Sequence, residues 1–425
     1  MGADEELPGI DAAYSACLDR IFEDFLAKRA ERSGRHDREV RAPEIALGIA
    51  RAHGLLPSPG STLAVTGSKG KGTVARLAAA YLAAQPGLGR IGLFVSPQEI
   101  DQVDRIRIDG RPIPRADFIR LYDRFEPDLD RARATLTGGR YLSPFGTFLL
   151  IALAWFRENG VAWTVLESGR GAAYDEVGRL PVGVAAVTSI FLEHAGQIGP
   201  GLRDIALNKL AIAKGAAATV LGPGVSGLIS RLDLPLPAGA RVVAERHHGP
   251  ALPGWCEIDL DIAVTAVDAL LELNGIAPAT VDVPVVTASF GQAGFEGCPL
   301  VYDATIAFPA FDRPYFEALR ATHGRVLVPL SLSDQKDAAP FISYFAAQGV
   351  DLAPIVLSGL DLHTYRRMEA DPLHTPVGAV AFTDASALAQ VLRQVVAEHR
   401  PGLIYALGIQ PFIRLLKQAA GIRFI

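Results

Sequence analysis

The chain has 425 residues, which is enough for two or three domains. Hydrophobic residues make up 49% of it and charged residues 20%, so the composition supports large buried cores and excludes extensive disorder. The net charge of −5 gives no reason to expect nucleic acid or an acidic membrane surface as a partner.

Cysteine usage and hydropathy indicate a cytoplasmic protein. The three cysteines lie far apart without CxxC spacing, which argues against a metal site or a disulfide framework and suits a reducing compartment. No apolar run is long enough to span a bilayer, and the acidic N-terminus is unlike a signal peptide. We therefore expect a cytoplasmic protein that binds neither membrane nor nucleic acid, as a monomer or a homodimer.

The chain begins with two helical patterns. Residues 10–32 place apolar side chains at helical spacing, and a second helix is expected over residues 42–53. Pro57 and Pro59 end that helix. The next stretch, from Ser61 to Leu77, predicts a buried strand, a turn with three glycines and an alanine-rich helix.

This order of strand, glycine turn and helix is typical of polyphosphate binding. Glycines let the backbone come close to phosphates, so that N–H groups and the helix N-terminus face the anion. Lys71 is placed to reach the terminal phosphates, and Thr73 to help hold Mg²⁺. Only two residues separate Gly67 from Gly70, where the general P-loop has four, and Gly72 precedes Thr73. The general P-loop match is therefore imperfect, and an ordinary strand-to-helix turn is the alternative. The residues expected to bind nucleotide are Gly67, Ser68, Lys69, Gly70, Lys71, Gly72 and Thr73.

Further strands end in side chains that suit such a site. We expect strands to end at Ser96, at Glu167 and shortly before His194. α/β sheets bind ligands at the carboxyl ends of their strands, and a carboxylate there can hold Mg²⁺ beside a nucleotide. The alternatives are a surface acid for Glu167 and a loop cap for His194. Lys209 follows on a helix, and we expect Glu167, His194 and Lys209 to converge on one side of the sheet.

The last part of the chain repeats strand and helix units. A segment rich in Gly and Pro, from Pro278 to Pro299, indicates a domain boundary. We therefore expect an α/β fold with an N-terminal and central P-loop domain over 1–290 and a smaller, mostly parallel α/β domain over 291–425. The expected strands of this smaller domain cover 300–303, 325–330, 353–357, 377–382 and 403–407, and a helix is expected over 386–399.

Five motifs, in the right order, resemble the Mur ligase superfamily, and most closely its folylpolyglutamate synthase/dihydrofolate synthase branch. The glycine turn is similar to that branch's Val-Thr-Gly-Thr-Asn-Gly-Lys-Gly-Ser loop, including the extra glycine. The other blocks resemble its Thr-Ser-Pro with Glu-Arg-Ile, Leu-Glu-Val-Gly-Leu-Gly-Gly, Thr-Ser-Ile-Gly-Leu-Asp-His and Ile-Ala-Glu-Lys-Ala-Gly-Ile-Ile-Lys motifs. The blocks cover residues 65–73, 95–97 with 104–106, 165–171, 188–194 and 205–214.

The resemblance implies a Mur-ligase-like central ATPase domain, a Rossmann-like C-terminal domain, and a ligase that uses ATP and Mg²⁺. Such an enzyme phosphorylates a carboxylic acid to an acyl phosphate, which an amino acid or another amine then attacks. By the same resemblance, Lys71 binds phosphates, and Lys71, His194 and Lys209 are catalytic, with Lys209 at the position of a carbamylated lysine. The implied magnesium ligands are Thr73, Ser96, Glu167 and His194.

The C-terminal and substrate-side motifs depart from the family pattern. Asp303 matches the first residue of Asp-Gly-Ala-His-Asn-Pro and is the implied nucleotide contact there, but the following His and Asn are replaced by Ile306 and Ala307. Ser333 to Asp337 still resembles an Asp-Lys-Asp stretch. On the substrate side, Gly146 stands where a Glu is usual. These losses put a pterin substrate in doubt.

Two other functions remain open from the sequence. The altered Asp303 region suits a nucleotide-binding homologue that is not catalytic or depends on a partner chain. A generic P-loop ATPase or kinase is a third possible function. The extra Gly72 argues against it, as do the blocks around His194 and Lys209. A product assay separates the three, because a ligase makes an amide together with ADP and phosphate.

Overall fold

The computed structural model describes residues 9–244, 252–283, 287–332, 336–361, 366–368 and 377–422. The chain folds into two compact units. Unit 1 comprises residues 1–246 and 258–284, and unit 2 comprises 247–257 and 285–425. Residues 284–286 of the expected boundary segment, and 333–335 of the Asp-Lys-Asp-like stretch, lie outside the described residues. The expected boundary between a P-loop domain over 1–290 and a smaller domain over 291–425 stays a prediction.

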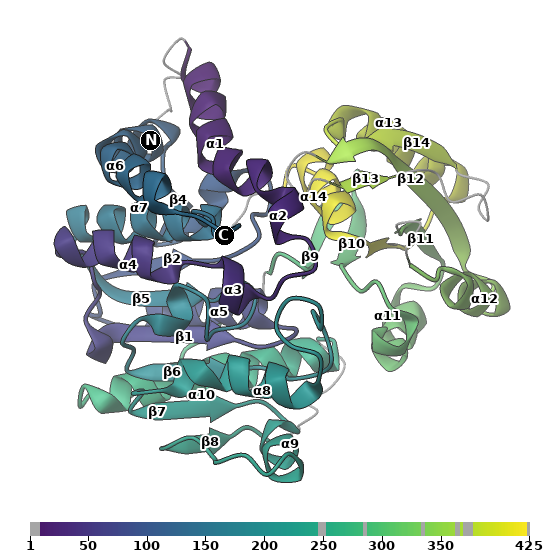
Figure 1. Ribbon diagram of the computed structural model, residues 1–425. Coiled ribbons are helices and arrows are strands. Elements are labelled where there is room, and N and C mark those ends of the chain that lie inside the picture. The colour runs from purple at the N-terminus through teal and green to yellow at the C-terminus, as the bar shows by residue number, and fades with distance from the viewer. Residues whose placement is uncertain are drawn as a thin grey trace. The chain divides into compact units, whose positions relative to one another are not determined.

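The described part of unit 1 is built on one eight-stranded sheet with the order β4-β3-β2-β5-β1-β6-β7-β8 (Figure 1). The run from β2 to β8 is parallel, and β3 and β4 extend it as antiparallel strands. All five residues of β1 are buried, as expected of a central parallel strand covered on both faces. The strands are β1 Thr62–Thr66, β2 Arg90–Phe94, β3 Ile106–Ile108, β4 Arg111–Pro112, β5 Val161–Glu167, β6 Val184–Val187, β7 Ala218–Leu221 and β8 Ala240–Val242.

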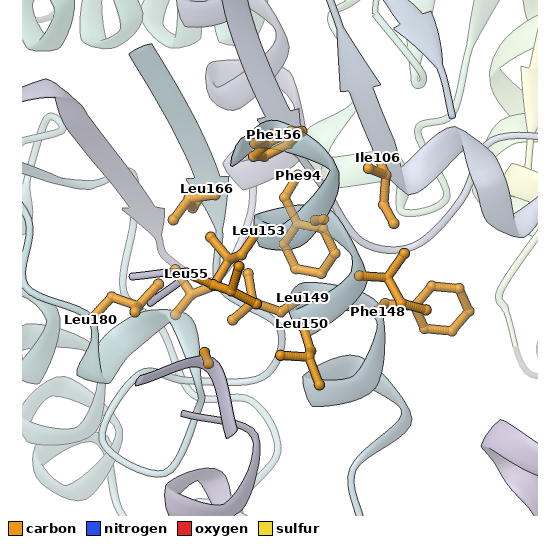
Figure 2. Packing of buried hydrophobic residues seen from close by; sticks show 14 of the residues in the cluster. Leu55, Phe94, Ile106, Phe148, Leu149, Leu150, Leu153, Phe156, Leu166 and Leu180 are labelled. Atoms are coloured by element: carbon orange, nitrogen blue, oxygen red, sulfur yellow. The ribbon is translucent and has the colours of Figure 1, made fainter. Parts of the chain in front are cut away.

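The helices of unit 1 form its core against this sheet. Helix α7 is apolar on all sides, and Phe148, Leu149 and Leu153 pack with Phe94 of β2 and Leu166 of β5 (Figure 2). Helix α4 packs on α7, and α1 packs on α6 and α7. The helices are α1 Ile10–Ala27, α2 Arg29–Arg32, α3 Asp37–Val40, α4 Pro43–Ala52, α5 Lys71–Ala84, α6 Arg115–Thr135, α7 Pro144–Glu158, α8 Leu202–Leu210, α9 Val225–Arg231 and α10 Gly254–Leu273, of which residues 254–257 belong to unit 2.

The described part of unit 2 contains a seven-stranded sheet with the order β13-β12-β11-β15-β10-β9, and β14 pairs with β12. Strands β10, β15, β11 and β12 are parallel, whereas β9 and β13 run antiparallel to their neighbours. The strands are β9 Phe290–Phe295, β10 Cys298–Asp303, β11 Val326–Ser331, β12 Asp351–Asp361, β13 Arg366–Met368, β14 Gly378–Ala381 and β15 Leu403–Gly408. The helices are α11 Arg313–His323, α12 Ala339–Ala347, α13 Ala385–His399 and α14 Gln410–Ala419.

Some expected boundaries were wrong. The expected first helix is divided at Lys28, between α1 and α2. Helix α10 begins at Gly254, whose N–H donates to the Asp312 carboxylate at 2.7 Å. Among the described residues, no helix is both long and apolar enough to cross a membrane.

Candidate functional site

The glycine turn between β1 and α5 requires glycine at two positions. Gly67 has φ +148°, and a Cβ there would lie 2.0 Å from Thr188 Oγ1. Gly70 has φ +83°, and a Cβ there would lie 2.4 Å from Asp259 Oδ1. Both values of φ disfavour side chains, and both sites lack room for one. The turn therefore approaches the segment after β6 and helix α10 more closely than any other residue would permit.

The turn leaves a row of backbone donors open. Ser68 N–H donates to Ser189 O at 2.8 Å, and Lys69 N–H to Ser189 Oγ at 3.0 Å, which fixes the turn against the segment after β6. In contrast, the N–H groups of residues 70–73 donate no hydrogen bond within the described part of the chain. They lie at the N-terminus of the 14-residue helix α5, whose dipole adds positive potential. The geometry is that of an anion-binding cradle.

Two lysine side chains meet at this turn. Lys71 Nζ lies 3.1 Å and Lys209 Nζ 2.8 Å from the same acceptor, Gly67 O. Lys209 is almost fully buried and also pairs with Glu193, at 2.9 Å between Nζ and Oε1. Burial lowers the pKa of Lys209, and the Glu193 carboxylate opposes that effect. Helix α8 thus brings Lys209 to the glycine turn, on the same side of the sheet as Glu167.

Glu167 ends β5 beside β1, where it is paired in register with Val65. Its Oε2 accepts the N–H of Ser96 at 2.9 Å, and its other oxygen accepts no hydrogen bond from the described residues. Burial raises the pKa of Glu167, while the Lys71 ammonium lowers it. A Cβ on Gly72 would lie 3.2 Å from Oε2, so the carboxylate faces the start of α5. Thr73 lies in that same first turn and is buried.

His194 lies beside these groups in a turn after β6. It has φ +50°, and its carbonyl oxygen accepts the N–H groups of Gln197 and Ile198, both at 2.9 Å. Its half-exposed ring lies 3.8 Å, Nε2 to Oε2, from Glu193. Burial lowers the pKa of His194, which favours a neutral imidazole. Within the described ranges, no group of three or more His, Cys, Asp or Glu side chains is arranged to hold a metal ion.

Three residues that support this site were not expected from the sequence. Glu193 neutralises Lys209, and Thr188 Oγ1 donates to Lys69 O. Arg76 Nη1 donates to Gly72 O at 3.1 Å, and its Nε lies 2.7 Å from Glu99 Oε1. The one available signal for Arg76 is its charge, which is the only one after Lys71 in an otherwise apolar helix and lies four residues after Gly72.

A buried ionic cluster lies beside the loop that follows Glu167. Arg41 Nη2 contacts Asp175 at 3.2 Å and Glu176 at 3.0 Å. A Cβ on Gly146 would lie 2.6 Å from Glu176 Oε1, so Glu176 fills the space next to the position where the family has its own Glu. Burial raises the pKa of Asp175 to about 7, against the Arg41 guanidinium. A carboxylate is therefore present in this region but comes from a different residue.

Asp303, in unit 2, ends β10 and is fully buried. Its Oδ1 accepts Thr305 N–H at 2.9 Å and Thr305 Oγ1–H at 2.7 Å, and its Oδ2 accepts the Tyr405 hydroxyl at 2.8 Å. Burial raises the pKa of Asp303, and these hydrogen bonds lower it. Oδ1 thus holds the turn after β10, whereas Oδ2 is bound to β15. Ile306, next in this turn, packs against an apolar cluster of unit 2.

Comparisons with known proteins identify similar chains. No protein-family model matches. A probable bifunctional folylpolyglutamate synthase/dihydropteroate synthase of Haloferax volcanii is 35% identical over 162 residues, which is 38% of this chain. The chain spans 19% of the length of that relative.

Solved structures match over nearly the whole chain. The apo form of L. casei folylpolyglutamate synthase superimposes with a TM-score of 0.71 and 17% identity, over 95% of this chain and 98% of that one. A Mycobacterium tuberculosis folylpolyglutamate synthase complexed with ADP and AMPPCP gives 0.65 and 20%, over 91% and 96%. The expected α/β fold, with a Mur-ligase-like P-loop unit and a smaller α/β unit, is confirmed. In fold over most of its length, and in sequence over 162 residues, the chain resembles the folylpolyglutamate synthases of the Mur ligase superfamily, as its motifs predict.

Proposed function

We propose that the chain is an ATP- and Mg²⁺-dependent ligase that joins a carboxylic acid to an amine through an acyl phosphate. The observation that carries this proposal is the row of unbonded N–H groups at residues 70–73, with Lys71 and Lys209 beside it. Together they provide the donors and positive charge that a polyphosphate requires. The folylpolyglutamate synthases that the chain resembles give the reaction class.

The proposed reaction depends on charge neutralisation and positioning. A carboxylate is a poor electrophile until its oxygen receives a phosphoryl group, which turns it into a leaving group. Lys71, whose ammonium lies at the turn, then leaves Gly67 O and follows the charge of the transferred phosphoryl group. Lys209 stays bound to Glu193 and keeps the Gly67 carbonyl in place. An amine bound next to the acyl phosphate attacks its carbonyl carbon, and phosphate leaves.

The residues at the strand ends fit magnesium. Mg²⁺ prefers hard oxygen ligands, and Glu167 has one carboxylate oxygen without a hydrogen bond from the described residues. The hydroxyl groups of Thr73 and Ser96 are further candidates, with His194 completing the proposed set. When bound, the ion would neutralise phosphate charge during transfer. Glu167 meanwhile keeps its hydrogen bond to the Ser96 backbone, which orients the carboxylate.

Lys209 is the proposed site of carbamylation, on the strength of the family resemblance alone. A carbamate forms when a neutral amine adds CO₂ and loses a proton, which places a carboxylate on the lysine. A ¹³C-bicarbonate NMR experiment tests this, with a carbamate signal expected in the wild type and absent from Lys209→Gln. No signal in the wild type would assign Lys209 to the ammonium role, bound to Glu193 and Gly67 O.

We also propose which acid and amine the enzyme joins. The relatives are named for folate, so folate with glutamate is the first acid and amine pair to supply, followed by other acids with other amino acids. Asp303 is kept as a proposed nucleotide contact of unit 2, made through the turn that its carboxylate holds. We also propose a cytoplasmic location.

A product assay tests the function. The wild-type chain, ATP, Mg²⁺, an acid and an amine should yield an amide, ADP and phosphate in equal amounts, detected by mass spectrometry and phosphate release. Lys71→Ala should abolish the reaction, whereas Arg51→Ala, an exposed cation on α4, should not change it. Amide formation by Lys71→Ala at the wild-type rate would reject the proposal.

The internal bonding of Asp303 favours a second candidate function. Because both of its oxygens are engaged within unit 2, the chain can bind nucleotide in unit 1 and yet lack a contact needed for ligation. A non-catalytic or partner-dependent nucleotide-binding homologue would show ATP binding without turnover for every acid and amine pair. A stable phosphorylated product without an amide would instead indicate a kinase.

A further inference from the structure

Arg170 lies in the loop after β5, three residues beyond Glu167, where the motif Leu-Glu-Val-Gly-Leu-Gly-Gly has its second Leu. Its guanidinium is held by the carboxylate of Asp37, because Nε donates to Oδ2 at 3.0 Å and Nη2 donates to Oδ1. The side chain of Asp37 is 3% exposed, whereas that of Arg170 is 36% exposed. A buried acid thus fixes the orientation of a cation that is open to a ligand.

The contact with Asp37 leaves one edge of the guanidinium unused. A guanidinium has five N–H donors in one plane, and Asp37 takes the edge formed by Nε and Nη2. Among the described residues, Nη1 of Arg170 has no hydrogen-bond or ion-pair partner. The edge formed by Nη1 and the second N–H of Nη2 therefore remains open. Such an edge matches the two oxygens of a carboxylate and can bind them bidentately.

The same contacts place Arg170 next to the turn that carries His194. Asp37 N–H donates to Gln197 O at 2.8 Å, and Gln197 N–H donates to His194 O at 2.9 Å. Burial is the main cause that lowers the pKa of His194, and Arg170 lowers it further, by more than Lys71 does. Because β5 and β1 are parallel neighbours, Arg170 also lies at the same end of the sheet as the glycine turn.

We propose that Arg170 binds a second carboxylate of the acid substrate, so that the enzyme acts on a small dicarboxylic acid. This inference rests on the proposed function, since it takes the chain as a ligase that activates a carboxylic acid. One carboxylate receives the phosphoryl group near the glycine turn, while the other is held by the open edge of Arg170 and does not react. The leucine of the motif has no side-chain N–H, so it cannot make this contact.

A purely structural ion pair makes a different prediction. If Arg170 only ties the loop after β5 to Asp37, then Arg170→Leu should slow the turnover of every acid to the same extent. If Arg170 binds a substrate carboxylate, the loss is confined to acids that carry two carboxylates. Arg170→Lys keeps the charge but loses the planar fork, so its effect should fall between those of the wild type and Arg170→Leu.

Hydroxamate formation by the full chain with ATP, Mg²⁺ and hydroxylamine tests the inference. Hydroxylamine attacks the carbonyl carbon of an acyl phosphate and releases phosphate, and it has no carboxylate, so the assay reports on the acid alone. The acids are the dicarboxylates succinate, glutarate and adipate, together with the monocarboxylates of the same chain length, butyrate, pentanoate and hexanoate. We expect at least one dicarboxylate to have a kcat/KM about tenfold or more above that of its matched monocarboxylate.

Arg170→Leu should lose this preference. The KM for the dicarboxylate should rise by about tenfold or more, and kcat/KM for the monocarboxylate should not change. Arg179→Leu is the matched control, because Arg179 is an exposed arginine later in the same loop and its Nε donates to Ala173 O at 2.8 Å. This control should keep the preference of the wild type.

The outcomes separate this inference from the proposed function. A wild type that forms no product from any of these acids or from folate, with hydroxylamine or with glutamate, would reject the proposed function and the inference with it. Activity on folate alone, or equal activity on both classes of acid, would reject the inference only. An equal loss for both classes in Arg170→Leu would assign a structural role to Arg170. A loss that appears only when glutamate replaces hydroxylamine would place the contact on the amine and would also overturn the inference.

Discussion

Glu167 in unit 1 and Asp303 in unit 2 occupy equivalent places in their sheets. Each is a buried acid at the end of a strand, followed by small residues, and burial raises the pKa of both. They differ in their partners. Glu167 accepts one backbone N–H and faces the cations of Lys71, Arg76 and Arg105, whereas Asp303 accepts three hydrogen bonds from Thr305 and Tyr405.

The same sequence signal, an acid at the end of a buried strand, therefore leads to two different roles. An acid whose oxygens are fully bonded stabilises the turn in which it lies. An acid with a free oxygen and cations nearby retains bonding capacity for a ligand. The comparison therefore predicts that Glu167 matters mainly for turnover and Asp303 mainly for stability.

The largest expected effect is that of Glu167→Gln. The amide keeps an oxygen that can accept the Ser96 N–H but removes the negative charge, so ATP turnover should fall by about 100- to 1,000-fold. The free energy of unfolding should be unchanged or higher, because a buried charge is lost. ADP release and urea denaturation measure the two quantities. Turnover within a few fold of the wild type would contradict the expectation that Glu167 matters mainly for turnover.

Asp303→Leu should show the opposite balance. Leucine has a similar size but accepts none of the three hydrogen bonds, so we expect a loss of about 2–4 kcal/mol in the free energy of unfolding of unit 2. Turnover should fall less than in Glu167→Gln when both are measured well below the melting temperature. A protein as stable as the wild type would show that the turn after β10 does not depend on Asp303.

Gly67→Ala tests how closely the unit 1 turn must approach its neighbours. A Cβ only 2.0 Å from Thr188 Oγ1 forces the turn to move, at a cost of about 1–3 kcal/mol in stability, and nucleotide binding should be lost. Gly87→Ala is the matched control, since Gly87 also has positive φ (+77°) but nothing within 4 Å of a Cβ. The control isolates the backbone strain, about 1–2 kcal/mol. Equal destabilisation of both variants would show that the contact with Thr188 is not limiting.

Asp175 provides a smaller, pH-dependent test of a third buried acid. Its pKa is raised to about 7 in the folded state, so the native protein binds a proton that the unfolded chain releases near pH 4. Stability from this group is present at low pH and is lost as pH rises toward 7, with a slope of up to about −1.4 kcal/mol per pH unit. Urea denaturation between pH 5 and 8 should show a shallower slope for Asp175→Asn than for the wild type. Asp19→Asn, an exposed acid on α1, should keep the wild-type slope.

The sequence predicted those parts of the site that depend on local pattern. The glycine turn, the strand ending at Glu167 and the position of Lys209 follow from short motifs, and the structure brings them to one place. Glu193, Arg41 and Asp259 could not be predicted, because they act on residues more than a hundred positions away or on a different element. The hydrogen bonds of Asp303 could not be predicted from the sequence either, since Tyr405, which donates to its carboxylate, lies 102 residues later.

Mg²⁺-dependent ATP binding, measured by calorimetry on the wild type and on Lys71→Ala, tests the central claim most directly. We predict binding by the wild type and a loss of about 100-fold or more in Lys71→Ala, because the open N–H groups and the lysine act together on the phosphates. A folded wild type that does not bind ATP, or equal affinity in the two proteins, would contradict the assignment of residues 67–73 as a phosphate-binding turn.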